Sequence, residues 1–335
     1  MNTAARRIGG LVDGVRAAAV VPGFSRVGFA VRSRLQQFRP MADYSLAGKT
    51  VVITGPTSGL GRAAAEVLAR SGASLVLVGR SPSKLVTVAA ELGTLITSPD
   101  RQSIDTAIAE MGDLEAVRRV CAEIIARHGA IHALVHNAGA LLNTRTLSAQ
   151  GYEQTIASHV LGPHLMTNLL LEPVRAGGGR IITVSSGGMY AAPLGSTGDI
   201  AEGGWPEMPP DRYDGTRQYA IAKRMQVTLN EMWAARQPDV TFASMHPGWA
   251  DTPGVQESIP TFRMITRPLL RTPAQGADTI GWLVADPAVT ARSGEFWCDR
   301  AVRPIHRLPG TRRSDAPANR AALWDWVQQH SGVGR

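Results

Sequence analysis

The segment from Lys49 to Arg70 constrains the fold most, because a strand, a glycine-rich turn and a helix follow one another in it. Residues 50–53 are apolar or β-branched, which is typical of a strand buried on both faces. Glycines let backbone approach a ligand closely, and the free N–H groups at a helix start attract phosphate. This placement favours a dinucleotide-binding turn over a glycine-rich loop of another α/β protein. The residues expected to bind the cofactor here are Thr54, Gly55, Ser58, Gly59, Leu60 and Gly61.

Strands and helices alternate along the rest of the chain. Strands are predicted at 74–79, 104–109, 131–136, 179–185 and 294–299, and helices at 116–125, 152–171 and 275–285. This alternation implies α/β architecture: a Rossmann-type, doubly wound parallel sheet in a single domain. We expect that domain to span residues 46–308. A basic amphipathic extension (1–45) would precede it, and a tail (309–335), disordered at 309–318 before a short helix, would follow.

The positive charge of the chain is concentrated at its two ends. The net charge is +8, with seven arginines and one aspartate in residues 1–40, and seven arginines and two aspartates in residues 300–335. The body between them is slightly acidic, which argues against nucleic acid as a partner. Cys121 and Cys298 are far apart and lack metal-ligand spacing. We therefore expect free thiols in a reducing cytoplasm, and no metal site.

Residues 1–40 also contain the pattern of an amphipathic helix. The longest apolar run, Ala17–Val21, is too short for a signal-peptide core or a membrane span. Two interpretations stay open. The stripe contacts an anionic membrane peripherally, or it covers an apolar patch of its own domain or of a second subunit in a homo-oligomer. The apolar stripe consists of Phe24, Val27, Val31, Leu35 and Phe38.

The residues after the second strand favour NADP over NAD. The strand is followed by Arg80, with Ser81 and Lys84 close behind it. An acidic residue here would bond the adenosine ribose hydroxyl, whereas an arginine accommodates a 2′-phosphate. Neither Gly79 nor Arg80 supplies an acid, so we expect Arg80 to contact the phosphate of NADP. The alternative is a solvated loop arginine.

Five motifs occur in an order and spacing that point to one family. They are the turn at 54–61, Asn137-Ala138-Gly139, Val184-Ser185-Ser186, Tyr219-x3-Lys223 and Pro247-Gly248-x3-Thr252. On these residues the chain resembles the short-chain dehydrogenase/reductase family over about residues 48–300. Stretches beginning at Ser185, His246 and Gln275 are similar to a narrower branch of that family. The resemblance implies further cofactor contacts from Glu110, Asn137, Ala138, Gly139, Tyr219, Lys223, Pro247, Gly248 and Thr252.

Tyr219 and Lys223 form the predicted catalytic pair. Their i, i+4 spacing places both on one helical face, and Lys223 is one of only three lysines in the chain. An ammonium group near a phenol lowers the phenol pKa from about 10, so Tyr219 could exchange a proton at neutral pH. The resemblance implies that Ser186 hydrogen-bonds the substrate carbonyl and that Lys223 holds the cofactor ribose. The alternative is an exposed helix pair without a catalytic role.

Three positions depart from the family pattern. His136 replaces the first of two asparagines, and Glu110 replaces an aspartate near the adenine. His159 occupies the place of an asparagine that, in the family, anchors a water in a proton relay ending at the lysine. An imidazole can donate from one nitrogen and accept at the other, so His159 could anchor the same water. The alternatives are a slow enzyme or a helix histidine without a relay role.

The segments around the predicted site indicate the kind of substrate. Residues 259–265 and 268–270 are largely apolar, and the resemblance makes this segment a mobile substrate lid. We therefore expect a hydrophobic carbonyl or alcohol, such as a lipid, terpenoid, steroid or polyketide, although a core or dimer contact would suit the same side chains. The gap from Ser186 to Tyr219 is longer than is usual in the family. Residues 191–216 are expected to form a surface excursion near the active-site mouth.

Together these features predict an NADP(H)-dependent oxidoreductase that interconverts a hydrophobic ketone or aldehyde and its alcohol. Ser186, Tyr219 and Lys223 would be its catalytic residues, with His159 as a fourth. A second hypothesis is a weakly catalytic cofactor-binding protein that recruits a partner or a membrane through its basic termini. The unusual His159 and the arginine-rich N-terminal arm keep that alternative open.

Overall fold

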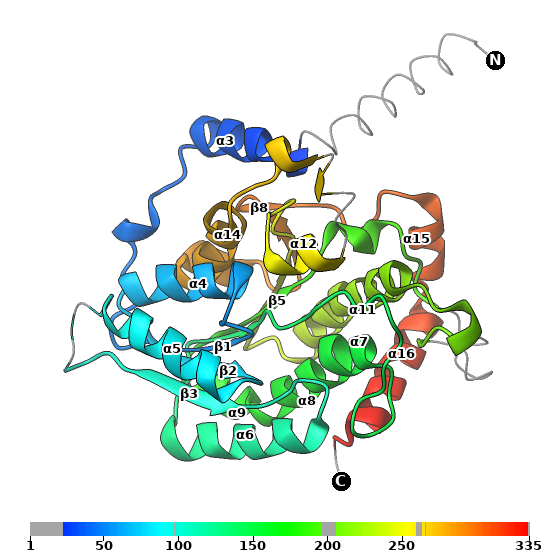
Figure 1. Ribbon diagram of the computed structural model, residues 1–335, viewed down its shortest axis with the longest axis horizontal. Helices are drawn as coiled ribbons and strands as arrows, with labels where there is room; N and C mark the ends of the chain where they lie inside the picture. Colours follow the sequence, from blue (N-terminus) through cyan, green and yellow to red (C-terminus); the bar gives the residue numbers. More distant parts are fainter. Residues whose placement is uncertain are drawn as a thin grey trace.

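The computed structural model describes residues 23–333, apart from 97, 99, 196–205, 259–262 and 265 (Figure 1). Its centre is a sheet of eight strands in the order β3-β2-β1-β4-β5-β6-β7-β8. All neighbouring strands are parallel except β7 and β8. The order reverses between β1 and β4, and ligands bind beyond the carboxyl ends of the strands at such a switch point. The predicted doubly wound, mostly parallel sheet in one domain is confirmed.

Six strands, β1 to β5 and β7, form where apolar runs were expected, with ends shifted by at most two residues, whereas β6 and β8 were not predicted. Helices cover both faces of the sheet, so its central strands are buried on both sides, and this explains their continuous apolar sequences. The strands are β1 (Thr50–Thr54), β2 (Ser74–Gly79), β3 (Ile104–Ile108), β4 (Ala133–His136), β5 (Arg180–Val184), β6 (Thr241–Met245), β7 (Phe296–Cys298) and β8 (Ala301–Val302).

Two apolar cores lie on opposite faces of the sheet. One packs the sheet against α4 (Gly59–Arg70), α5 (Pro82–Gly93) and α14 (Pro273–Ala285). The other packs it against α6 (Leu114–Arg127), α8 (Gly162–Leu169), α11 (Gly215–Arg236) and α16 (Pro317–Ser331). The remaining α-helices of the described residues are α3 (Arg26–Leu35), α7 (Gln154–Ile156), α9 (Leu171–Ala176), α12 (Pro253–Ser258) and α15 (Pro309–Ser314).

The helix predicted over 152–171 is interrupted where it passes the site. It consists of α7, a π-helical turn (Ala157–Leu161) and α8. The π turn carries His159, which is fully buried. Such turns inside α-helices are frequent at functional sites, because they change the direction in which a side chain projects.

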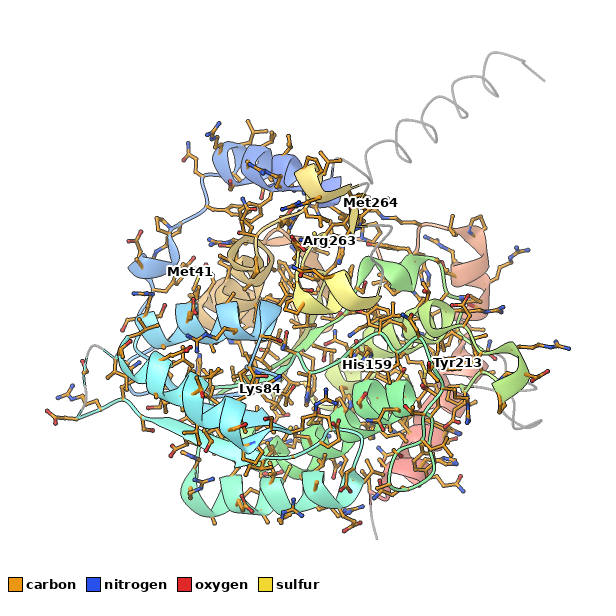
Figure 2. All side chains as sticks on the ribbon, viewed as in Figure 1. Met41, Lys84, His159, Tyr213, Arg263 and Met264 are labelled. Atoms are coloured by element: carbon orange, nitrogen blue, oxygen red, sulfur yellow. The ribbon has the colours of Figure 1, made fainter. Side chains whose placement is uncertain are left out.

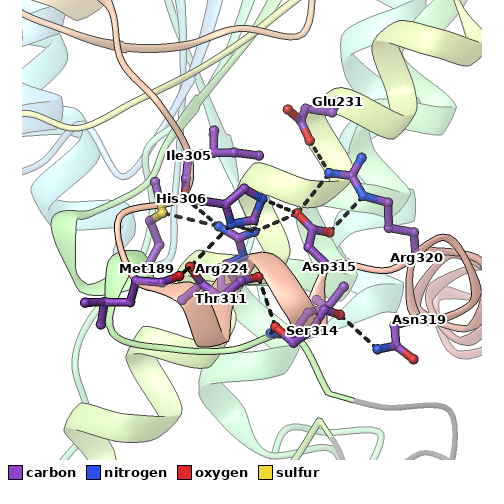
Figure 3. A network of polar contacts seen from close by, with 12 residues as sticks. Met189, Arg224, Glu231, Ile305, His306, Thr311, Ser314, Asp315, Asn319 and Arg320 are labelled. Atoms are coloured by element: carbon purple, nitrogen blue, oxygen red, sulfur yellow. Dashed lines mark hydrogen bonds and ion pairs between the residues drawn. The ribbon is translucent and has the colours of Figure 1, made fainter. Parts of the chain in front are cut away.

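The C-terminal segment is folded, so the expectation of disorder at 309–318 is wrong. Residues 309–314 form α15, and Leu323 and Val327 of α16 are fully buried in the core beside α8 and α11. Asp315 joins the two helices to α11, because its carboxylate binds Arg224 at 2.6 Å and Arg320 at 2.8 Å (Figure 3). A buried ion pair at this place fixes the tail against the domain.

The N-terminal arm contacts its own domain and also leaves an apolar face in solvent. Phe24 is buried against His246, with ring centroids 4.4 Å apart, and its carbonyl accepts the N–H of Trp249 at 2.9 Å. The other stripe residues behave differently. The side chains of α3 that remain exposed, by 55%, 50% and 79%, are Val27, Val31 and Leu35. Phe24 thus covers its own domain, and the face formed by Val27, Val31 and Leu35 stays exposed in the single chain. Residues 1–22 lie outside the described part.

Candidate active site

The turn after β1 needs glycine because backbone passes close to backbone there. Gly55 and Gly59 have φ of +68° and +54°, a region that side chains disfavour. A Cβ on Gly55 would lie 2.9 Å from the Cα of Ala138, and a Cβ on Gly61 would overlap the carbonyl oxygen of Gly55. Only a chain without side chains at these positions can form this concave loop.

Two predicted motifs are tied together at the ends of β1 and β4. The Thr54 hydroxyl accepts the N–H groups of Asn137 at 3.0 Å and Ala138 at 2.9 Å. The Asn137 amide donates to the carbonyls of Thr54 at 2.9 Å and Gly55 at 3.1 Å. Gly139 follows at the exposed edge. The loop that would face the pyrophosphate and the loop that would face the nicotinamide ribose are therefore held in one rigid unit.

The start of α4 suits a phosphate group. Ser58 is the N-cap residue, but its side chain makes no capping hydrogen bond, so the first N–H groups of this 12-residue helix remain for a ligand. Leu60 packs against α14 at Gly276, and Thr252 lies against Gly59. At the motif of Pro247 and Gly248, the Arg271 guanidinium donates to the Pro247 carbonyl at 3.1 Å. These residues fit a dinucleotide cofactor along the sheet edge.

The part of the sheet edge that would face the adenine carries basic side chains, and the Arg80 side chain there is mostly exposed. Arg80 is 80% exposed in its side chain, and its guanidinium pairs with Glu110 at 3.3 Å. A hollow of about 420 Å³ lies between the glycine turn and α5, and Thr57, Arg62, Ser83 and Lys84 contribute to its lining. Arg62 is already paired with Glu66 and Glu91. Lys84 has no hydrogen bond or ion pair within the described ranges, which leaves its ammonium group for an anion.

The three predicted catalytic side chains meet beyond the end of β5. Asp214 caps α11 by accepting two backbone N–H groups, and the helix then presents Tyr219 and Lys223 on one face. The Lys223 ammonium lies 5.2 Å from the centroid of the Tyr219 ring. Ser186 follows β5, and its hydroxyl accepts the N–H of Gly188 at 3.2 Å and hydrogen-bonds Tyr219.

The Tyr219 phenol pKa is raised by burial, whereas the sequence predicted that Lys223 would lower it. Desolvation raises the pKa of the Tyr219 phenol to about 12, and the hydrogen bond with Ser186 opposes this rise. Desolvation also lowers the pKa of Lys223 to about 7, so the lysine carries only part of a charge at neutral pH. The predicted lowering of the phenol pKa requires a charged ammonium group on Lys223. In the structure the phenol is protonated at neutral pH and is suited to proton donation.

His159 lies beside the pair, and an unpredicted glutamine joins it to Lys223. The His159 and Tyr219 rings meet edge to face, with centroids 5.4 Å apart. The Lys223 ammonium donates to the Val184 carbonyl at 2.9 Å and to the Gln226 amide oxygen at 3.1 Å, and the Gln226 amide donates to the backbone carbonyl of His159 at 2.8 Å. The i, i+3 spacing of Lys223 and Gln226 was the signal in the sequence that could have indicated this contact.

The substrate side of the site is only partly described. Of the expected lid, residues 259–262 and 265 lie outside the described residues, and Met264 is 74% exposed at the periphery, whereas His159 lies in the interior (Figure 2). Of the expected surface excursion, 196–205 is likewise outside. The flanking part is anchored rather than free: Glu207 pairs with Arg145 at 2.9 Å and accepts the N–H of Glu153.

A Rossmann sheet with this glycine turn and this Ser–Tyr–Lys cluster defines an NAD(P)-dependent oxidoreductase, and comparisons with known proteins identify the family. A family model for short chain dehydrogenase matches residues 49–196. Dehydrogenase/reductase SDR family member 12 of Bos taurus is 36% identical over 289 residues, covering 86% of this chain and 87% of the bovine protein. The chain therefore belongs to the short-chain dehydrogenase/reductase family, as its motifs predicted, and its chemistry is hydride exchange between NAD(P) and a carbonyl or alcohol.

Two further comparisons concern a more distant relative and a solved structure with a similar fold. Polyprenol dehydrogenase of Mus musculus is 29% identical over 313 residues, covering 89% of this chain and 88% of the mouse protein. A crystal structure of a protein from Mycobacterium paratuberculosis superposes with a TM-score of 0.67 at 22% identity, covering 88% of this chain and 97% of that one. In the part of the chain that the structure describes, no helix is both long and apolar enough to cross a membrane.

Proposed function

We propose that the protein is an NADP(H)-dependent carbonyl reductase or alcohol dehydrogenase that interconverts a hydrophobic ketone or aldehyde and its alcohol. The observation that carries the proposal is the contact of Ser186, Tyr219 and Lys223 at the sheet edge, next to a glycine turn that fits a dinucleotide. Nicotinamide, when bound, supplies or accepts the hydride. A screen of carbonyl compounds that follows NADPH absorbance tests the proposal, and turnover of any of them also rejects the weakly catalytic alternative.

The chain's own groups would divide the remaining work. Tyr219 is protonated at neutral pH and would donate its proton to the carbonyl oxygen during reduction. Ser186 would hold the same oxygen by a hydrogen bond. The protonated form of Lys223 donates two of its N–H groups to Val184 and Gln226, and its third N–H group would bind the ribose of the cofactor. The buried amine thus orients the cofactor beside the tyrosine.

The basic adenine end supports NADP as the preferred cofactor. Replacing Arg80 by alanine should weaken NADPH binding by about 1–3 kcal/mol, as for loss of a charge-assisted hydrogen bond to phosphate, and should leave NADH binding almost unchanged. Titration of both cofactors against both proteins measures the difference. Arg127→Ala, at an exposed arginine of α6, is the matched control. Equal affinity of the unmodified protein for NADPH and NADH would contradict the assignment.

The hydrophobic substrate class is supported by the apolar composition of the lid and by one relative. Residues 259–265 and 268–270 are largely apolar in sequence, and Met264 and Leu269 are exposed. Polyprenol dehydrogenase, named for a long-chain lipid alcohol, matches this chain along 89% of its length. In a series of ketones that differ in chain length, kcat/KM should rise with the apolar surface of the substrate.

A peripheral membrane contact is supported by the exposed face of α3. Val27, Val31 and Leu35 project into solvent, and Arg26 and Arg34 on the same helix are exposed as well. An apolar stripe flanked by arginines is complementary to an anionic lipid surface. We place this contact in the cytoplasm, in agreement with the two free, buried thiols.

This contact predicts a loss of vesicle binding in a double variant. Val31→Asp with Leu35→Asp should reduce co-sedimentation with anionic vesicles about tenfold or more, because two apolar side chains lose their burial. Binding to neutral vesicles should be weak throughout. Val86→Asp is the control, since Val86 is 65% exposed on α5, away from the arm. If the unmodified protein ignores anionic vesicles, the membrane contact is rejected and a second subunit becomes the candidate for this face.

A further inference from the structure

A small cavity of about 30 Å³ is lined by His159 and Gln226, the two residues that contact Tyr219 and Lys223. It is bounded by residues of β4, the π turn, α8, β5, α11 and β6, and its lining combines apolar and polar side chains. A cavity of this size has room for one or two water molecules. The polar residues that line it are His136, His159, His164, Thr167, Thr183, Gln226 and Asn230.

Several polar atoms of this lining have no partner of good hydrogen-bond geometry among the described residues. They are Nδ1 of His136, Nδ1 of His159, Nε2 of His164 and Oδ1 of Asn230. All four side chains are at least 96% buried. Buried polar groups in native proteins are almost always hydrogen-bonded, to protein or to ordered water. Such a concentration of unpartnered atoms around one cavity points to bound water.

The hydrogen bonds that do exist determine which atoms donate. Trp233 can only donate from its indole, and it donates to Nδ1 of His164 at 3.3 Å. In the neutral ring, the proton of His164 must therefore lie on Nε2, and this N–H is a donor for the cavity. The Asn230 amide nitrogen donates to the Gly294 carbonyl at 3.0 Å, so its oxygen remains as an acceptor. The cavity thus has a defined donor and a defined acceptor.

We propose that this cavity is a structural water site that sets the orientation and tautomer of His159. A water molecule in the cavity would accept a hydrogen bond from His164 Nε2–H. It would donate its own two hydrogens to Asn230 Oδ1 and to the His159 ring. The His159 Nε2 faces the opposite way, since it would lie 2.5 Å from a Cβ on Gly139. Nδ1 is therefore the nitrogen that accepts from water, and Nε2 carries the proton toward the backbone of Gly139 and Ala140.

This water site would position the catalytic pair through the two residues that contact it. His159 packs edge-on against Tyr219, and Gln226, which also lines the cavity, binds Lys223. Desolvation keeps His136 and His164 neutral by lowering the pKa of each to about 3, and it lowers the pKa of His159 too. Water on one side and backbone on the other would hold the neutral His159 ring in one orientation. The ring would then not accept a proton from Lys223. His159, His164 and Asn230 are thus positioning residues for the pair.

The direct test does not depend on turnover. A high-resolution crystal structure of the full chain should show water within hydrogen-bond distance of His164 Nε2 and Asn230 Oδ1. Nitrogen-15 NMR of the imidazoles should assign the Nε2–H tautomer to His159. In His164→Phe, which fills the cavity, that signature should shift or average, and His164→Gln, which restores a donor and an acceptor, should recover it. A dry cavity, or a His159 tautomer unaffected by His164→Phe, would overturn the inference.

The kinetic readout rests on the proposed function and is a second, separate test. His164→Phe should lower kcat about tenfold through misplacement of the catalytic pair, with KM for NADPH unchanged, and His164→Gln should restore most of it. His132→Gln is the control, since His132 is another histidine with a depressed pKa that does not line the cavity. If the unmodified protein reduces no carbonyl, the proposed function fails while the crystallographic and NMR results still decide the water site.

Discussion

Replacing Tyr219 by phenylalanine is expected to lower turnover by ~10²-fold or more while leaving NADPH affinity nearly unchanged. The variant keeps the ring that packs against His159 and loses only the hydroxyl that would donate the proton. Because Ser186 bonds the same hydroxyl, Ser186→Ala should lower turnover in the same direction. Steady-state kinetics on a carbonyl substrate, with cofactor binding measured separately, checks both variants.

The control for this experiment is a tyrosine that is not part of the site. Tyr44 donates its hydroxyl to Asp286 at 2.6 Å and contributes to the core on the opposite face of the sheet. Tyr44→Phe should change stability slightly and leave turnover intact. The catalytic assignment fails if Tyr219→Phe retains full turnover on a substrate that the unmodified protein reduces.

Replacing Asp315 by asparagine is expected to lower the free energy of unfolding by about 3–5 kcal/mol, the usual cost of breaking a buried ion pair by removing one partner. The Arg224 side chain is fully buried, and Asp315 is its only carboxylate partner among the described residues (Figure 3). The same carboxylate also binds Arg320 and lies 3.0 Å from the His306 ring. Without it, a buried guanidinium would face an amide that cannot balance its charge.

Urea denaturation followed by circular dichroism measures this loss. Asp211→Asn is the control, because Asp211 and its neighbour Arg212 are both mostly exposed, and such pairs contribute little. A loss below about 1 kcal/mol in Asp315→Asn would show that Arg224 is satisfied by the Ile305 carbonyl and by water instead.

The fold could be predicted from the sequence because its signals are local. The predicted strands read as apolar runs, since both faces of the sheet are covered, and the turn after β1 carries its own glycines. The prediction of disorder at residues 309–318 was wrong because the contact that orders them is distant in sequence. Asp315 looks like a solvated loop residue until α11 brings Arg224 against it, and no periodicity in the tail announces that contact.

The candidate site could be predicted where it depends on the spacing of residues along the sequence. Ser186, Tyr219 and Lys223 could be identified because the motif places them at a strand end and on one helix face. The pKa values could not, because desolvation of Tyr219 and Lys223 depends on everything packed around them. The histidine-lined cavity was likewise hidden, since His136 and His164 come from separate elements and meet His159 only after the sheet and helices have packed.

Residues 23–25 dock onto the domain, so the packed part of the chain begins before the segment that carries the motifs. A shortened chain beginning at Met41 would keep every strand and every cofactor motif. It would lose the Phe24 carbonyl that receives the Trp249 N–H, and the carbonyls of Gly23 and Ser25 that receive Arg271. Arg271 itself buttresses the Pro247 carbonyl in the cofactor loop. Residues that precede the first strand thus act as part of the cofactor-loop scaffold, and trimming them would reshape the site from a distance.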